Sequence, residues 1–136
     1  MGVIVLDAGI IIAALDGSDA HHGAAVRALR DARDGGDTLV VPASAYAEAL
    51  VGPSRRGADA IATVEAFLRA LPASVEPASR DIAHGAAGLR AVHGSSLRLP
   101  DALVLATAQV LHADTVLTTD AGWPTTGIEV TVLRPR

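Results

Sequence analysis

Four acidic residues in this chain stand at the end of an apolar segment or close to one, where they could do metal chemistry. Asp7 follows the apolar run at residues 3–6, and Asp120 follows Leu117 and two threonines. Glu48 lies in an otherwise largely apolar stretch, and Asp101 comes directly after a Leu-Pro pair. Buried carboxylates cost free energy unless a cation or a hydrogen-bond donor compensates them.

Carboxylates that converge without basic partners indicate a site for a hard divalent cation. Oxygen ligands of this kind suit Mg²⁺ or Mn²⁺. Each residue also has an ordinary structural interpretation. Asp7 and Asp101 suit the starts of helices, Glu48 a solvent-facing helical position, and Asp120 a turn. The four together, ordered along one chain, favour the metal site.

The composition excludes several other chemistries. The 136 residues contain no cysteine, which excludes disulfides, thiolate nucleophiles and cysteine-based zinc sites. Lysine is also absent, since all 11 basic residues are arginine. A phosphate-binding Walker A loop and a Schiff-base enzyme both require lysine. Codon bias is the ordinary explanation for the missing lysine.

The five histidines and a few other polar residues offer weaker alternatives. No histidine spacing, including the adjacent pair His21 and His22, matches a usual zinc motif. Ser44 lacks the sequence context of a nucleophile paired with histidine. Arg55 and Arg56 could contact a phosphate backbone, although a solvated loop is the simpler interpretation.

Charge and hydropathy bound the surroundings in which the chain works. A net charge of −4 argues against tight nonspecific binding of nucleic acid, but bound divalent cations would reverse the local sign of an acidic site. Neither a signal peptide nor an apolar stretch of the roughly 18 residues needed for a membrane span is evident. We therefore expect a cytoplasmic protein without a membrane partner.

Hydrophobic patterning predicts strands that alternate with helices. The strands are expected at residues 3–6, 38–41, 74–76, 115–118 and 128–133. Helices are expected at residues 10–15, 20–32, 57–70, 79–92 and 101–111, with a short one capped by Ser44, carrying Glu48 and ended by Gly52 and Pro53. Residues 1–136 are expected to form a single domain.

This alternation predicts an α/β fold, a three-layer α/β/α sandwich around a central, mostly parallel sheet. In such sheets, ligands bind beyond the carboxyl ends of the strands, at the point where the strand order reverses. Asp7 and Asp120 each stand just past the end of a predicted strand. The architecture therefore places them where a site is expected.

The same residues carry a resemblance to a known family. The chain resembles PIN domains, and most closely the VapC-type toxin ribonucleases of bacterial type II toxin–antitoxin pairs. The resemblance spans nearly the whole chain. Its most specific element is the block at residues 99–108; the others are residues 3–7, Ser44 with Glu48, and residues 117–120 followed by Trp123.

The resemblance implies an Mg²⁺- or Mn²⁺-dependent endoribonuclease that hydrolyses phosphodiester bonds in RNA. It implies that Asp7, Glu48, Asp101 and Asp120 form the catalytic and metal-binding quartet. It also implies inhibition by a cognate antitoxin protein, whose helical segment would block the acidic pocket, and a homodimer.

Two positions depart from the family pattern. Ala8 stands where the family usually has Thr or Ser, so a hydroxyl beside the metal site is missing, and Trp123 stands where the family generally has Phe. Ala8 leaves open a PIN-like module that binds RNA or protein without cutting. A haloacid-dehalogenase-type phosphatase is disfavoured by Gly9, where a second aspartate would be needed, and by the missing lysine.

Overall fold

The computed structural model describes residues 1–135 and contains one five-stranded sheet. The strands are β1 (Val3–Leu6), β2 (Thr38–Pro42), β3 (Ala73–Glu76), β4 (Thr115–Thr118) and β5 (Val130–Val132). Their order in the sheet is β3-β2-β1-β4-β5, and every pairing is parallel. The first strand of the chain is therefore the central one.

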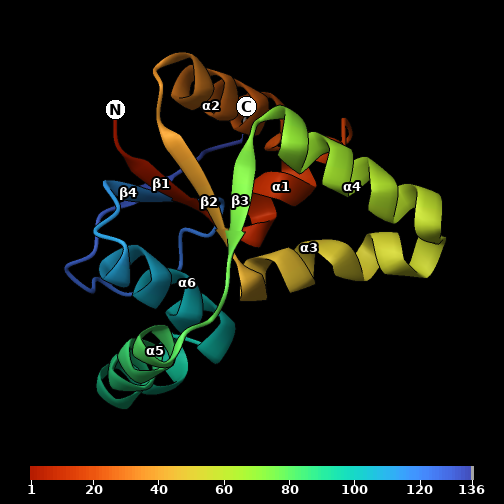
Figure 1. Cartoon of the computed structure of the whole chain (residues 1–136). Helices are drawn as coiled ribbons and strands as arrows, with labels where there is room; N and C mark the ends of the chain where they lie inside the picture. The colour runs from red at the N-terminus through yellow and green to blue at the C-terminus, as the bar shows by residue number, and fades with distance from the viewer. Residues whose placement is uncertain (136) are drawn as a thin grey trace.

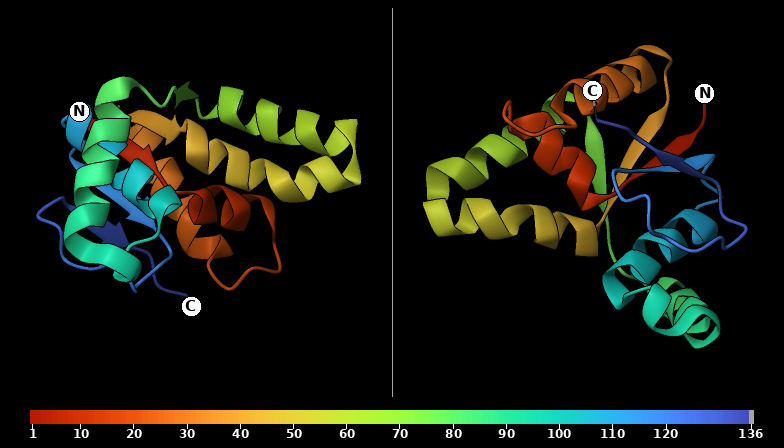
Figure 2. Two further views of the ribbon diagram at one scale, coloured as in Figure 1. Left: turned by 90° about the horizontal axis from the view of Figure 1, so that it is seen from below. Right: turned by 180° about the vertical axis from the view of Figure 1, so that it is seen from behind.

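Helices cover both faces of this sheet, which confirms the three-layer α/β/α sandwich (Figure 1). The first group is α1 (Ala8–Leu15), α2 (His22–Asp34), α3 (Ala43–Arg56) and α4 (Ala58–Ala70). The second group is α5 (Arg80–His93) and α6 (Leu99–Val110), joined by a short 3-10 turn (Gly94–Ser96). Two views in Figure 2 show α3 and α4 as a helical hairpin that extends away from the sheet.

The strand order reverses between β1 and β4. The connections from β1 to β2 and from β2 to β3 build the sheet in one direction, and the connection from β3 returns to the other side of β1. Val5 of β1 pairs with Val40 of β2 on one side and with Val116 of β4 on the other, and Leu6 pairs with Leu117 of β4. This is the topological switch point at which α/β sheets bind ligands.

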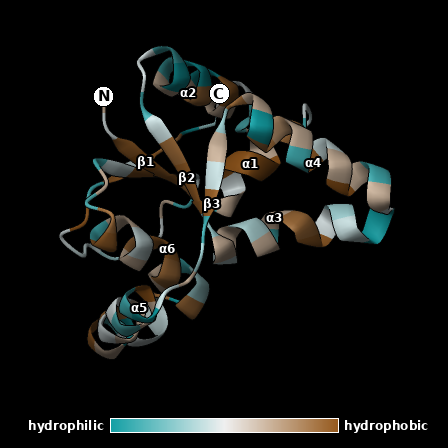
Figure 3. Ribbon diagram, in the orientation of Figure 1, coloured by the Kyte–Doolittle hydropathy of each residue, from teal (hydrophilic) through white to brown (hydrophobic). Residues whose placement is uncertain are grey.

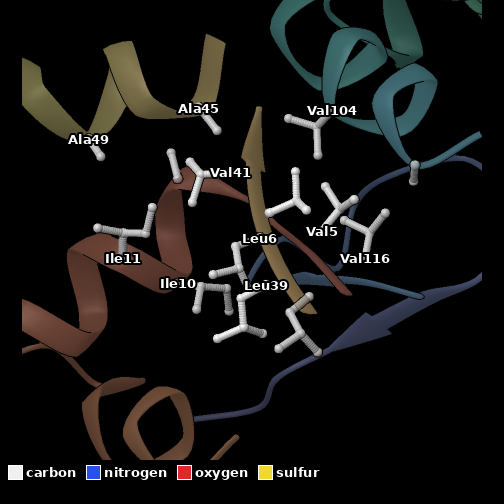
Figure 4. Close-up of a cluster of buried hydrophobic side chains, with 14 of the residues drawn as sticks. Val5, Leu6, Ile10, Ile11, Leu39, Val41, Ala45, Ala49, Val104 and Val116 are labelled. Atoms are coloured by element: carbon white, nitrogen blue, oxygen red, sulfur yellow. The ribbon is translucent and has the colours of Figure 1, made fainter. Parts of the chain in front are cut away.

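The core lies between the sheet and the helices, and aliphatic side chains fill it. Buried residues include Leu6 and Val116 from the central strands, Ile10 and Ile11 from α1, and Val104 from α6 (Figure 4). Both faces of β1 and β2 are covered, so these strands are almost continuously apolar (Figure 3). The packing holds the carboxyl ends of β1 and β4 side by side.

Most predicted elements are confirmed to within a few residues, but one helix differs clearly. The helix that carries Glu48 continues through Gly52 and Pro53 to Arg56, whereas these two residues were expected to end it. Pro53 is buried, so tertiary packing outweighs its poor fit inside a helix. Pro42, not Ser44, occupies the N-cap position. No helix in residues 1–135 combines the length and the hydropathy required to cross a bilayer.

Candidate active site

Asp7 lies at the junction between β1 and α1, and its carboxylate accepts two hydrogen bonds. Oδ1 accepts from the backbone N–H of Ala8 at 2.9 Å, which makes Asp7 the N-cap of α1. Oδ2 accepts from the hydroxyl of Thr118 at 2.7 Å. The backbone N–H of Asp7 donates to the carbonyl of Leu117 at 2.9 Å, so β4 fixes the position of the whole residue.

The carboxyl group of Asp7 is almost completely buried, with 9% of the residue exposed. Burial raises the pKa of Asp7 above its ordinary value, and its two hydrogen bonds oppose that rise. The negative charges of Glu48 and Asp120 raise the pKa further. Burying an acid close to two other negative charges destabilises the folded state. Such an arrangement is typical of a functional site.

Asp120 stands two residues beyond the end of β4, in the turn that follows Thr118. Its backbone N–H donates to Oγ1 of Thr118 at 3.1 Å. Its side-chain Oδ1 accepts from the N–H of Gly122 at 2.7 Å, and its other oxygen is free in the exposed turn. The Thr118 hydroxyl thus contacts both acids: it donates to Asp7 and accepts from Asp120.

Asp101 reaches the site from the first turn of α6, on the other side of the sheet. Burial raises its pKa most strongly, and the charges of Asp7 and Asp120 raise it further. Arg98 and the indole N–H of Trp123 act in the opposite direction. The guanidinium Nε of Arg98 lies 3.9 Å from Oδ2 of Asp101, but its side chain is 78% exposed, so solvent screens this pair.

Glu48 is an exposed residue on α3, and its charge acts on Asp7. It lines a cavity of about 630 Å³ between α1, α3 and α4, together with apolar side chains such as Ile12, Leu15 and Val64. Glu48 therefore stands where this cavity meets the acidic site.

The structure places Asp7, Asp101 and Asp120 near the carboxyl ends of β1 and β4, and Glu48 of α3 near enough for its charge to act on Asp7. The charges of Glu48 and Asp120 raise the pKa of Asp7, and the charges of Asp7 and Asp120 raise the pKa of Asp101. Among the side chains of residues 1–135, Arg98 is the basic group in ion-pair contact with any of the four. We refer to these four residues as the acidic site.

The donor set of the acidic site fits a hard divalent cation, but not a closed protein cage. All of its charged oxygens are carboxylate oxygens, which Mg²⁺ and Mn²⁺ prefer. Within the described residues, no three His, Cys, Asp or Glu side chains are arranged to ligate one ion together. This suits Mg²⁺, which retains several water ligands and takes one or two carboxylates from the protein.

Other polar residues, some of them weighed from the sequence, have structural roles. Nδ1 of His22 is 2.8 Å from the carbonyl of Ala13, and His21 pairs with Asp19. Asp114 accepts from the N–H of Val3 at 2.8 Å, at the other end of β1 from Asp7. Because these side chains make structural contacts of their own, we restrict the candidate site to the four acids.

Three features of the site were not predicted from the sequence. Thr118 holds two acids through one buried hydroxyl, and it supplies Asp7 with a hydroxyl although Ala8 has none. The indole N–H of Trp123 is buried; it makes no hydrogen bond of good geometry within residues 1–135, yet it lies near enough to Asp101 to lower its pKa. The Ser44 hydroxyl is likewise buried without a partner there. The Thr-Thr-Asp run was the only signal for Thr118.

Solved structures share this fold at low sequence identity. A chain of VapBC2 from Rickettsia felis, bound to a promoter DNA fragment, superposes with a TM-score of 0.75 at 15% identity, over 97% of this chain and 99% of that one. A chain of VapBC-1 from nontypeable Haemophilus influenzae superposes with a TM-score of 0.73 at 17% identity, over 96% of this chain and 97% of that one. VapC20 from Mycobacterium tuberculosis, a Sarcin-Ricin loop cleaving toxin, superposes with a TM-score of 0.67 at 20% identity, over 83% of this chain and 86% of that one.

No curated protein sequence matches the chain. The PIN domain family model, in contrast, matches residues 4–128, which include β1 from Ile4 on, β2 to β4, helices α1 to α6 and the whole acidic site. The chain belongs to the PIN domain family, and its fold is that of the chains in VapBC toxin–antitoxin structures.

Proposed function

We propose that this protein is a metal-dependent endoribonuclease that hydrolyses phosphodiester bonds in RNA and acts as the toxin of a toxin–antitoxin pair. The observation that carries the proposal is Asp7, a buried carboxylate at the switch point of the sheet whose pKa is raised by burial and by two further acids. Such a group is stabilised when a cation neutralises it.

In this proposal Asp7 and Asp101 are the principal ligands of Mg²⁺ or Mn²⁺, directly or through water, and Glu48 and Asp120 complete the shell through bound water. A bound divalent cation would neutralise the nonbridging phosphate oxygens and lower the pKa of water. The two hydrogen bonds to Asp7 fix the direction of its remaining lone pairs. Ligand orientation is then set before substrate binds.

Glu48 and Asp120 are both exposed acids, and in this proposal one of them orients the attacking water; we assign Asp120 to this role. Its Oδ1 is held by Gly122, while its second oxygen lies in an exposed turn. Water adds across the P–O3′ bond: its oxygen bonds to phosphorus, and a proton passes to the departing O3′. The products are a 5′-phosphate and a 3′-hydroxyl.

Cleavage of a labelled RNA pool with Mg²⁺, Mn²⁺ or EDTA tests the proposal. We expect cutting with either cation, none with EDTA, and a loss in Asp7→Asn greater than the roughly 10–100-fold typical of an outer-shell change. Asp81→Asn is the matched control, because Asp81 is an exposed acid in the first turn of α5. Wild-type cleavage rates in Asp7→Asn would contradict the role of Asp7. RNA bound but never cut would favour a noncatalytic PIN-like binding module, for which Ala8 is the supporting observation.

The proposed antitoxin partner would occupy the cavity between α1, α3 and α4. Its apolar wall includes the partly exposed Ile12 and Leu15, and Glu48 connects it with the acidic site. A helical antitoxin segment with a basic residue would bury this wall and neutralise the acids. Structures of toxin–antitoxin complexes share the fold. A second copy of the chain is also proposed as a partner, which light scattering on the purified protein tests.

A further inference from the structure

A second cavity lies beside the acidic site, on the side of β5. It has a volume of about 290 Å³, and its walls include Asp120, Trp123, Thr126, Glu129 and Val132. These residues come from β5 and from the wide loop that connects β4 to β5 (Figure 2). The volume is below the roughly 300–1,000 Å³ of pockets for drug-sized ligands, so it suits a single small ring system.

Two residues that line the cavity, Asp120 and Trp123, also act on the acidic site. The charge of Asp120 acts on Asp7 and Asp101. The indole N–H of Trp123 is buried and lies near Asp101. A ligand in the cavity would therefore lie beside the proposed reaction centre.

The walls favour a flat, neutral ring over a phosphate. Trp123 and Val132 supply apolar surface, while the carboxylates of Asp120 and Glu129 repel anions and accept hydrogen bonds. Oγ1 of Thr126 accepts from the N–H of Ile128 at 3.3 Å, which leaves its own proton free to donate. Nucleobases have a π-face that stacks on aromatic side chains, and exocyclic amino groups that donate to carboxylates.

We propose that this cavity is a subsite for one unpaired nucleobase of the RNA substrate, adjacent to the scissile phosphate and stacked on Trp123. The proposal rests on the proposed ribonuclease function, and it names how the same site holds its substrate. The negative charge of the cavity keeps the phosphates on the acidic site, where a cation neutralises them. RNA with unstacked bases is thereby selected over an RNA duplex, whose bases are not free to enter.

Nucleoside 5′-monophosphates test this subsite, because they contain no phosphodiester bond to cut. AMP, CMP, GMP and UMP are titrated into the wild-type protein with Mg²⁺, and ribose 5-phosphate serves as the probe without a base. Trp123 is the only tryptophan of the chain, so its fluorescence and its indole N–H resonance report on the cavity directly. We expect at least one nucleotide to quench and shift Trp123 and to bind about 5- to 150-fold more tightly than ribose 5-phosphate.

Three variants separate stacking from general packing, and the backbone amides of Thr126 and Val132 report binding in each. Trp123→Phe keeps an aromatic face and should lose little nucleotide affinity, whereas Trp123→Leu should reduce it to that of ribose 5-phosphate. Val132→Phe leaves Trp123 in place and adds bulk at another lining position of the cavity, so it should also abolish the preference for the base. This variant decides the question if Trp123→Leu fails to fold.

The subsite is wrong if nucleotides and ribose 5-phosphate bind alike, if none of the probes binds, or if Val132→Phe leaves nucleotide affinity unchanged. These results do not depend on cleavage. A wild-type protein that cuts RNA but shows no base preference overturns the subsite alone. A protein that binds nucleotides through Trp123 but never cuts RNA overturns the proposed nuclease and retains the subsite.

Discussion

The hydroxyl of Thr118 donates a hydrogen bond to Oδ2 of Asp7 at 2.7 Å, across 111 residues of sequence. The hydroxyl oxygen of Thr118 also accepts a hydrogen bond from the backbone N–H of Asp120 at 3.1 Å. Thr118 is fully buried, so no water can replace either contact. One small polar side chain therefore sets the positions of two acids of the proposed metal site.

Thr118→Val should reduce both stability and RNA cleavage. Valine matches threonine in shape, but it leaves a buried carboxylate oxygen of Asp7 and the partly buried N–H of Asp120 without this partner, which costs about 1–3 kcal/mol. Cleavage should fall about 10–100-fold, as for other residues that orient metal ligands. Urea denaturation and a cleavage time course measure the two effects.

Thr119→Val is the matched control for this prediction. Thr119 is the next residue, and its hydroxyl makes no side-chain hydrogen bond within residues 1–135. It should lose less stability and less activity than Thr118→Val. Equal effects in the two variants would show that the Thr118 hydroxyl has no special role.

Without divalent cations, the protein should become less stable as the pH rises above the ordinary aspartate value of 3.8. The pKa values of Asp7 and Asp101 are raised in the folded state, chiefly by burial. In this window the folded protein binds more protons than the unfolded chain, so the free energy of unfolding falls with pH until both folded-state pKa values are passed. Urea denaturation in EDTA across this range measures the slope.

Asp7→Asn should flatten this pH dependence and raise stability at neutral pH without cations. Asparagine remains a good N-cap for α1, and it cannot ionise. The Asp81→Asn control should keep the wild-type slope. A slope that is unchanged in Asp7→Asn would mean that the burial of Asp7 does not govern it.

Mg²⁺ should raise the thermal midpoint of the wild-type protein and have much less effect on Asp7→Asn or Asp101→Asn. At a free concentration of 100 times the dissociation constant, binding to the folded state adds about 2.7 kcal/mol. For a chain of 136 residues this corresponds to a shift of roughly 5–16 °C. Scanning calorimetry with and without Mg²⁺ gives the shift, and equal shifts in all three proteins would place the ion elsewhere.

Gly9→Ala should disturb the site by displacing Thr119. A Cβ at position 9 would lie 2.5 Å from Oγ1 of Thr119, so this side chain must move next to Asp120. We expect a cost of about 1 kcal/mol and slower cleavage. In a Thr119→Ala background the clash is absent, and alanine should then stabilise α1 by up to about 1 kcal/mol because it is the better helix former. Thermal melts measure the stability effect of Gly9→Ala in both backgrounds. The prediction is contradicted if Gly9→Ala destabilises the Thr119→Ala variant as it does the wild-type protein.

The sequence predicted the elements whose patterns are local and strong. The apolar runs that form β1 and β4 ended where expected, and the rule that ligands bind at strand ends placed Asp7 and Asp120 together. The helix signal after Pro100 also placed Asp101 correctly in the first turn of α6. These predictions depend on neighbours in the chain, so local patterning was sufficient.

The incorrect or missing predictions depend on contacts across the fold. Pro53 remains inside α3 because it is buried, which the Gly-Pro pair alone does not reveal. The sequence shows that Trp123 stands where the family generally has Phe, but it does not show that the indole N–H lies beside Asp101. The sequence around Thr118 is that of an ordinary threonine at the end of a strand. It does not indicate a hydrogen bond to Asp7, which lies 111 residues away in the chain.

The central position of β1 has a consequence for protein synthesis. Its partner β4 is synthesised more than 100 residues later, so a nascent chain cannot close the sheet until residues 115–118 have left the ribosome. Asp7 lacks the Thr118 hydroxyl throughout that interval. A truncated chain that ends before residue 118 would therefore lack the assembled acidic site, and with it the metal site that we propose.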